Sequence, residues 1–200
     1  MDKLGPRHKM CRRVGEPLCG RPNCPALKRP YPPGQHGRGR KRATEFQMRL
    51  LEKQKLRAMY GVNERQMRAY FAKATRREGV TGEELIKQLE MRLDAVSLRL
   101  GFGLSLRQAR QLVSHGHVLV DGKRVDIPSY QVKPGQAIEV SPKARVFVGV
   151  REALELSPEP PPYLYRNRDE FSGTLSRTPE RTEIPLPAAL DERLVVEHYS

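Results

Sequence analysis

The segment SLRQARQLVSHGHVLVDGKRV, residues 105–125, decides the fold because its apolar period changes halfway along. Apolar side chains first recur at spacings of three and four, from Leu106 to Val113, as they do on the buried side of a helix. Ser105 and Gln108 form a capping-box pattern where this helix would begin. The first half of the segment therefore predicts a short amphipathic helix.

The second half of the segment predicts strands. Residues 118–120 are a Val-Leu-Val run, and Asp121-Gly122 favours a tight hairpin turn before a second strand at 123–125. A further strand is expected at 137–140, after another turn. Together the two halves indicate a helix pair that leads into a small antiparallel sheet.

Three helices are expected upstream, each beginning at a residue that can cap a helix and ending at a glycine. They run from Thr44 to Gly61, from Asn63 to Gly79 and from Thr81 to Gly101. Downstream, residues 157–162 form a Pro-rich linker, and only short strands are expected beyond it, the last at 194–196. The fold class is therefore α+β, with a helical N-terminal domain and a small module of two helices packed on an antiparallel sheet.

Residues 1–43 are rich in Gly and Pro and show no apolar period, so they are expected to form an extended basic arm. The chain is then divided into four parts. These are the arm at 1–43, the helical domain at 44–90, the α/β module at 91–156, and at 157–200 the linker with a tail that packs back on the body.

Charge is unevenly distributed along the chain. The 37 Lys and Arg residues outnumber the 23 Asp and Glu residues, and the excess lies in the first three quarters. Such a field attracts a polyanion and releases its condensed counterions, which favours nucleic acid as the partner. No apolar run approaches the ~20 residues of a membrane-spanning helix, and residues 1–13 lack the apolar part of a signal peptide. We therefore expect a cytoplasmic protein without a membrane partner.

Polar and basic side chains gather in the arm, on the first two helices, and on the helix and hairpin of residues 105–125. The basic run of the arm could also be an ordinary solvated tail. The residues expected to contact RNA are Arg38, Arg40, Lys41, Arg42, Lys53, Lys55, Arg57, Arg65, Arg68, Arg107, Arg110, Gln111, His115, His117, Lys123 and Arg124.

A possible metal site lies in the arm, where one imidazole and three thiols fall within seventeen residues. The spacing His8-x-x-Cys11 and Cys19-x-x-x-x-Cys24 could complete the tetrahedral shell of one Zn²⁺. His36 could take the place of His8, and three free cysteines remain the alternative interpretation. Nearby basic residues would favour thiolate over thiol.

Motifs of catalysis are not recognisable in the sequence. The stretch around Gly116 and Lys123 is only superficially like a phosphate-binding loop, because Arg124 stands where that motif needs Ser or Thr. His115 and His117 have no evident Ser, Cys or carboxylate partner, and we interpret them as turn or RNA-contact residues. The protein is not expected to be an enzyme.

Several stretches together resemble one known family, the bacterial small-subunit ribosomal protein four. They are RPYPPGQHG at 29–37, EKQK at 52–55, RLD at 92–94, RLGF at 99–102, RQARQLVSHGH at 107–117, PSY at 128–130 and EHYS at 197–200. The resemblance runs nearly end to end, although residues 151–189 fit the family only loosely.

The resemblance implies a primary binder of 16S rRNA that grips a junction in the 5′ domain and nucleates assembly of the 30S body. It also implies a position beside the fifth small-subunit protein, near the mRNA entry channel, and an influence on translational accuracy. Many relatives hold zinc through four cysteines in the arm. Cys11, Cys19 and Cys24 match three of these positions, and His8 stands at the first.

Two rival functions remain at this point. An RNA-modifying enzyme could use the module at 91–156 as a tether, but about fifty residues of Pro-rich tail cannot supply its catalytic domain. A zinc-dependent DNA-binding regulator is the second rival. Sedimentation of cell extract separates them, because a ribosomal protein would travel with small subunits.

Overall fold

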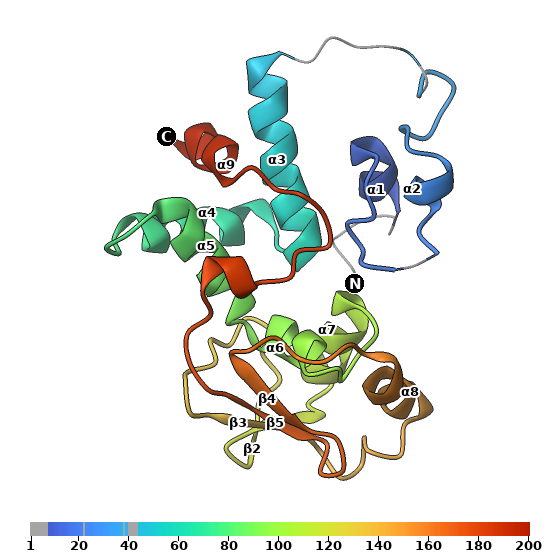
Figure 1. Ribbon diagram of the computed structural model, residues 1–200, viewed down its shortest axis with the longest axis vertical. Helices are drawn as coiled ribbons and strands as arrows, with labels where there is room; N and C mark the ends of the chain where they lie inside the picture. The colour runs from blue at the N-terminus through green and yellow to red at the C-terminus, as the bar shows by residue number, and fades with distance from the viewer. Residues whose placement is uncertain (1–7, 22, 38, 40–43) are drawn as a thin grey trace. The chain divides into compact units, whose positions relative to one another are not determined.

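The computed structural model describes residues 8–21, 23–37, 39 and 44–200 (Figure 1). The expected RNA contacts at Arg38, Arg40, Lys41 and Arg42 lie outside these residues. The chain divides into two compact units, residues 1–85 with 186–200 and residues 86–185. Within the described part, none of the helices is both long enough and apolar enough to cross a bilayer.

The first unit, as far as it is described, is built from helices whose ends follow the sequence. Its larger helices are α3 (Glu45–Tyr60) and α4 (Glu64–Thr75), and α5 (Thr81–Glu90) begins in this unit. The N-caps Thr44 and Asn63 each complete a capping box, and α3 ends at Gly61 in the left-handed conformation with φ 57°. The first expected helix is therefore confirmed, and the second is confirmed at its start but ends at Thr75, with Arg76 as its C-cap, and not at Gly79.

The end of the chain is helical, so the strand expected at 194–196 is wrong. Helix α9 (Glu192–Tyr199) begins at Asp191, whose side chain accepts hydrogen bonds from the backbone N–H groups of Arg193 and Leu194. It packs against α3, and Val195 is buried (Figure 1). Capping and tertiary packing here override the strand preference of consecutive valines.

The second unit contains a five-stranded antiparallel sheet in the order β2-β1-β3-β5-β4. The strands are β1 (Val118–Val120), β2 (Lys123–Arg124), β3 (Ala137–Val140), β4 (Leu164–Asn167) and β5 (Ser172–Leu175). Asp121 and Gly122 have φ 50° and 74°, as a two-residue hairpin turn requires. The expected hairpin, the strand at 137–140 and the α+β class are confirmed.

Two helices of this unit, α6 (Leu93–Arg99) and α7 (Leu106–Ser114), pack against each other beside the sheet (Figure 1). Ser105 caps α7 through the backbone N–H of Gln108. Fully buried apolar side chains from these helices and the sheet form the core. They include Leu93, Leu100, Phe102, Val113, Val118, Ile138, Val140 and Leu175.

The single helix expected from Thr81 to Gly101 is wrong, because the chain breaks between α5 and α6. Arg92 is extended, with φ −70° and ψ 142°, and forms an isolated bridge with Gln131. Its guanidinium binds the carboxylate of Asp94 through two hydrogen bonds of 3.0 and 2.9 Å. Both side chains are buried, and this pairing overrides the continuous apolar period.

The segment after β3 contains a helix that the sequence did not predict. Helix α8 (Val148–Leu156) buries Val150, Ala153 and Leu154, while β4 and β5 extend the sheet from β3. A short 3₁₀ turn, η1 (Arg181–Glu183), follows. The apolar spacing within α8 is helical, but the segment is short. Its N-cap residue is Phe147, which cannot cap a helix through its side chain, so the sequence carries no start signal for this helix.

Asp94 provides a test of this fold. Asp94→Ala should lower the free energy of unfolding by about 3–5 kcal/mol, because it leaves the buried guanidinium of Arg92 without its counter-charge. Urea unfolding measures the loss. The exposed Asp126→Ala is the control and should stay within about 0.5 kcal/mol of the parent. A loss below about 1 kcal/mol at Asp94 would contradict the role given to this pair.

Candidate metal centre and nucleic-acid interface

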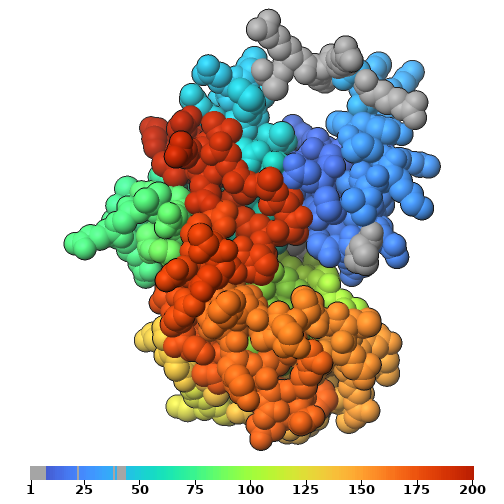
Figure 2. All heavy atoms as spheres, viewed as in Figure 1, coloured from blue at the N-terminus to red at the C-terminus, as the bar shows by residue number. Residues whose placement is uncertain are grey.

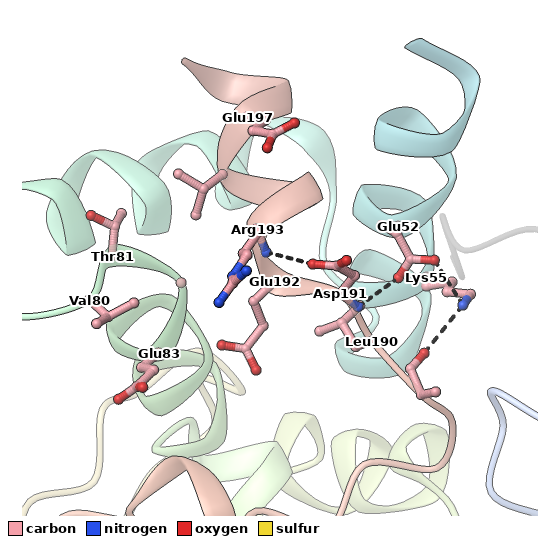
Figure 3. Close-up of a pocket in the computed structure, with 13 residues that line it drawn as sticks. Glu52, Lys55, Val80, Thr81, Glu83, Leu190, Asp191, Glu192, Arg193 and Glu197 are labelled. Atoms are coloured by element: carbon pink, nitrogen blue, oxygen red, sulfur yellow. Dashed lines mark hydrogen bonds and ion pairs between the residues drawn. The ribbon is translucent and has the colours of Figure 1, made fainter. Parts of the chain in front are cut away.

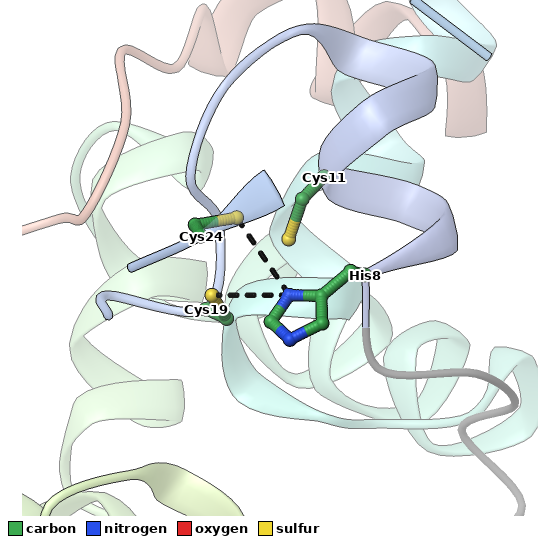
Figure 4. Close-up of side chains that lie close together, drawn as sticks. All are labelled: His8, Cys11, Cys19 and Cys24. Carbon is green, nitrogen blue, oxygen red and sulfur yellow. Dashed lines mark hydrogen bonds between the residues drawn. The ribbon is translucent and has the colours of Figure 1, made fainter. Parts of the chain in front are cut away.

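Four potential metal ligands converge in the first unit. The donor atoms of His8, Cys11, Cys19 and Cys24 all lie within 4.8 Å of one another (Figure 4). His8 precedes α1 (Lys9–Val14), which carries Cys11, and Cys24 precedes α2 (Pro25–Lys28). His8 Nδ1 lies 3.8 Å from Cys19 Sγ and 3.7 Å from Cys24 Sγ. The arm is therefore folded locally around this cluster rather than extended throughout.

These residues fit a tetrahedral metal ion. With bonds of about 2.3 Å to sulfur and 2.0 Å to nitrogen, tetrahedral ligands lie roughly 3.6–3.8 Å apart, close to the two measured separations. The three cysteines are free thiols, so no disulfide competes. Of the two histidines considered, His8 joins the cluster, whereas His36 is exposed and does not. The group could hold a metal ion with His8 as its nitrogen ligand through Nδ1.

The acidity of the thiols bears on how a metal would bind. Burial raises the pKa of Cys11 to about 12, with a further contribution from the neighbouring Cys19. Burial also raises the pKa of Cys24. The expectation that basic neighbours would favour thiolate is not met at these two thiols, whose pKa burial raises. A cation would therefore have to displace protons from these sulfurs on binding.

Short helices make this cluster important for the arm. Helix α1 has six residues and α2 has four, lengths that are unstable in water on their own. Leu18 and Ala26 are among the few apolar residues buried there with the cysteines. Arg12 also lies over the ring of Tyr31, at 5.3 Å from its centroid. Among the described residues of the arm, Cys11 and Cys24 are two of the four buried apolar side chains.

Several cations expected to contact RNA lie inside the first unit. Lys53 is 5 % exposed and pairs with Glu64 at 3.1 Å, and Lys55 is 7 % exposed and pairs with Glu52 at 2.9 Å. Arg57 donates to Glu64 at 3.0 Å. In contrast, Arg65 and Arg68 of α4 are exposed. Burial therefore separates cations that hold helices together from cations that reach solvent.

The hollow beside Lys55 is acidic. It lies between α3, the start of α5 and α9, and Figure 3 shows Glu52 accepting a hydrogen bond from the backbone N–H of Asp191. Its lining has five carboxylates and two cations, which are Glu52, Glu83, Asp191, Glu192, Glu197, Lys55 and Arg193. This charge balance does not suit a phosphate ligand.

The expected RNA-contact residues of the second unit also differ in how exposed they are. Arg110 donates to the buried Asp94 through Nε at 2.8 Å and Nη2 at 2.6 Å, so its guanidinium is held against the core. Arg107 and His117 are partly exposed. Four more of the expected contacts are exposed, namely Gln111, His115, Lys123 and Arg124.

Other solvent-facing residues of this unit were not singled out from the sequence. They include Lys133, Lys143, Arg151 and the aromatic Phe147. No motif distinguishes these cations from ordinary surface charges. The signal for Phe147 is its place in an apolar run at the beginning of α8, which is informative only once that helix is known.

Two known families match successive parts of the chain. Residues 2–90 match the family described as the ribosomal protein S4/S9 N-terminal domain, and residues 91–138 match the S4 domain. The α6–α7 pair and strands β1 to β3 lie within the second match or reach its end. The fold and the two matches define a ribosomal protein that carries an S4 domain.

Full-length relatives narrow this class. The chain is 52% identical to the small ribosomal subunit protein uS4 of Geobacillus sp. (strain WCH70), over 98% of this chain and 97% of the relative. It is 48% identical to that of Thermoanaerobacter sp. (strain X514) and 50% identical to that of Lysinibacillus sphaericus (strain C3-41), with the same coverage. The chain belongs to the uS4 family of small ribosomal subunit proteins, and the resemblance found in its motifs is confirmed.

Glu64 should make the stability of the first unit depend on pH. Burial alone would raise its pKa, but hydrogen bonds from Lys53 and Tyr199 and the charges of Lys53 and Arg57 lower it below 4.5. Because the folded pKa is depressed, the stabilisation is present above pH 4.5 and is lost as pH falls through the folded value. Glu64→Gln should cost roughly 1 kcal/mol at pH 7, since the side chain is one-third exposed.

Urea unfolding at a series of pH values measures this dependence. The difference between the parent and Glu64→Gln should shrink below pH 4.5, whereas the exposed Glu78→Gln should follow the parent throughout. A difference that stays constant down to the acid end would show that the charge of Glu64 does not contribute.

Proposed function

We propose that this protein is a structural constituent of the small ribosomal subunit, in the cytoplasm, that binds the 5′ domain of 16S rRNA and nucleates assembly of the 30S body. The observation that carries the proposal is the identity of about half of all residues with uS4 proteins over 98% of the chain. The role has no chemical step, so the protein acts by binding and not as an enzyme.

The proposed partners follow from the same family. Besides 16S rRNA, they are neighbouring small-subunit proteins, in particular the fifth, and mRNA near its entry channel, where the protein contributes to translational accuracy. The net charge of +14 supports a polyanionic partner. The acidic hollow of the first unit is better suited to a basic protein surface than to RNA.

RNA recognition would rely on shape and phosphate contacts with little base reading. We assign these contacts to the exposed side chains of the expected set. They are Arg65 and Arg68 on α4, and Arg107, Gln111, His115, His117, Lys123 and Arg124 in the second unit. Lys53, Lys55, Arg57 and Arg110 would act indirectly, by holding the helices that carry these contacts. The arginines and lysine at 38–42 stay a prediction.

The metal proposed for the arm is one Zn²⁺ held by His8, Cys11, Cys19 and Cys24. Four protein ligands leave no open position, which is typical of a structural rather than a catalytic ion. The ion would supply a cross-link between α1, α2 and the loop that carries Cys19. Its benefit to RNA binding would be a fixed shape for the basic arm.

Binding to a 5′-domain fragment of 16S rRNA tests the proposed function. The parent should bind with a steep dependence of log affinity on log salt. The Lys123→Ala/Arg124→Ala pair should reduce the slope by about 0.7–0.9 for each phosphate that these side chains no longer neutralise. Arg177→Ala is the matched control, because Arg177 is exposed in the same unit and pairs with Glu183. It should leave both affinity and slope unchanged.

Failure of the parent to bind this RNA, or its absence from isolated small subunits, would overturn the proposed function. Binding by the parent that is insensitive to the Lys123 and Arg124 changes would instead show that the assigned face is wrong.

Metal analysis tests the arm. Native mass spectrometry of gently purified protein should find one zinc per chain, and Co²⁺ in its place should give the thiolate charge-transfer absorption of a sulfur-rich tetrahedral site. Cys24→Ser and His8→Ala should each weaken metal retention, by roughly 10-fold or more. His36→Ala should retain the ion as the parent does, since His36 lies outside the cluster. A metal-free parent under these conditions would end the zinc proposal.

A further inference from the structure

Three consecutive apolar residues face water where α8 begins. Val146, Phe147 and Val148 are 63 %, 42 % and 68 % exposed. Helix α8 lies at the surface of its unit, where Figure 2 shows residues near 150–155 in orange. Phe147 occupies the N-cap position, which favours Ser, Thr, Asp or Asn, and it makes no side-chain capping bond. Helix formation therefore does not account for a phenylalanine here.

The ring of Phe147 meets a second planar group. The centroid of His117 lies 5.2 Å away and the two rings are perpendicular, at 89°. In such a pair the edge of one ring meets one face of the other. Each ring has two faces, so three of the four faces are not covered by this contact. The large exposed fraction of Phe147 leaves ring surface open to solvent.

Arg124 is the third planar group considered, and its side chain lies against the backbone of Gly116. Its side chain lies so close to Gly116 that a Cβ there would come within 1.9 Å of Nε. Gly116 has φ 70°, a conformation that glycine adopts without strain. Arg124 Nη2 also donates to the carbonyl oxygen of His115 at 3.5 Å. His117 and Phe147 are in ring contact, and Arg124 lies against Gly116, the residue before His117; these three planar groups are here named the planar surface.

Several exposed cations are close in sequence to the residues of the planar surface. Exposed cations follow or precede its members along the chain, namely Lys123, Lys143 and Arg151. The carboxylate of Asp121 accepts hydrogen bonds from Gln136 and from the backbone N–H of Ala137. Glu139 lies 3.9 Å from Arg145, and Asp126, Glu152 and Glu155 are exposed. The four exposed cations of these segments, Lys123, Arg124, Lys143 and Arg151, outnumber these three exposed carboxylates.

We propose that the planar surface accepts an unpaired base of the RNA, with phosphates of the same strand near Lys123 and Lys143. The inference rests on the proposed function for its partner, and it adds a base contact to recognition otherwise assigned to phosphates. Phenylalanine, histidine and arginine are the side chains on which splayed bases stack. An apolar protein partner would cover the two valines but would leave the neighbouring cations without counter-charge.

Affinity measured as a function of salt tests this contact with the full chain. Phe147→Ala should weaken binding to the 16S 5′-domain fragment by about 5- to 150-fold at every KCl concentration. The slope of log affinity against log salt should not change, because stacking releases no counterions from phosphates. Phe147→Leu keeps an apolar side chain but removes the ring, and it should lose nearly as much affinity.

Leu156→Ala is the matched control, because Leu156 is 71 % exposed at the other end of the same helix. It should bind as the parent does, and the melting temperatures of all three variants should match the parent. Affinity of Phe147→Ala within twofold of the parent would overturn the proposal, as would recovery of affinity in Phe147→Leu. Normal RNA affinity with weaker incorporation into particles would overturn it in favour of a protein partner. Failure of the parent itself to bind would count against the proposed function instead.

Discussion

The carboxylate of Asp94 has no exposed surface, and its charge must be neutralised inside the second unit. Arg92 and Arg110 supply that neutralisation and join the start of α6 to α7. Glu90 is buried in the same way, where Arg99 and the hydroxyl of Tyr163 donate to it. Because a buried charge without a partner is costly, these carboxylates determine which arginines are available to an external polyanion.

The same constraint operates in the first unit with lysines. Glu64 of α4 pairs with Lys53 of α3, and Lys53 also lies 5.7 Å from the ring centroid of Tyr199. Lys55 pairs with Glu52 within α3 and with Glu16 of the arm. In the arm, a metal ion in the proposed site would balance the charge of three cysteine thiolates, with His8 as a neutral ligand. Internal pairing would thus give a rigid scaffold, and the remaining cations would give the RNA its contacts.

Local signals in the sequence were sufficient for much of this fold. The capping boxes at Thr44 and Asn63 and the Asp121-Gly122 turn depend on neighbouring residues alone, so they could be predicted. The break at Arg92 and the helical form of 192–199 depend on partners far along the chain. Pairing in space likewise buries Lys53 and Lys55, although their sequence is that of an exposed basic helix. The four residues of the candidate metal centre could be predicted because their spacing along the chain is short.

Lysine reactivity, measured residue by residue with mass spectrometry, tests the separation of internal from external cations most directly. The protein would be acetylated briefly, with and without the 16S 5′-domain fragment. Lys53 and Lys55 should be unreactive in both samples, whereas Lys123 and Lys143 should react in the free protein and be protected by RNA. Equal reactivity of Lys123 and Lys143 in both samples, together with RNA-dependent protection of Lys53, would contradict the account.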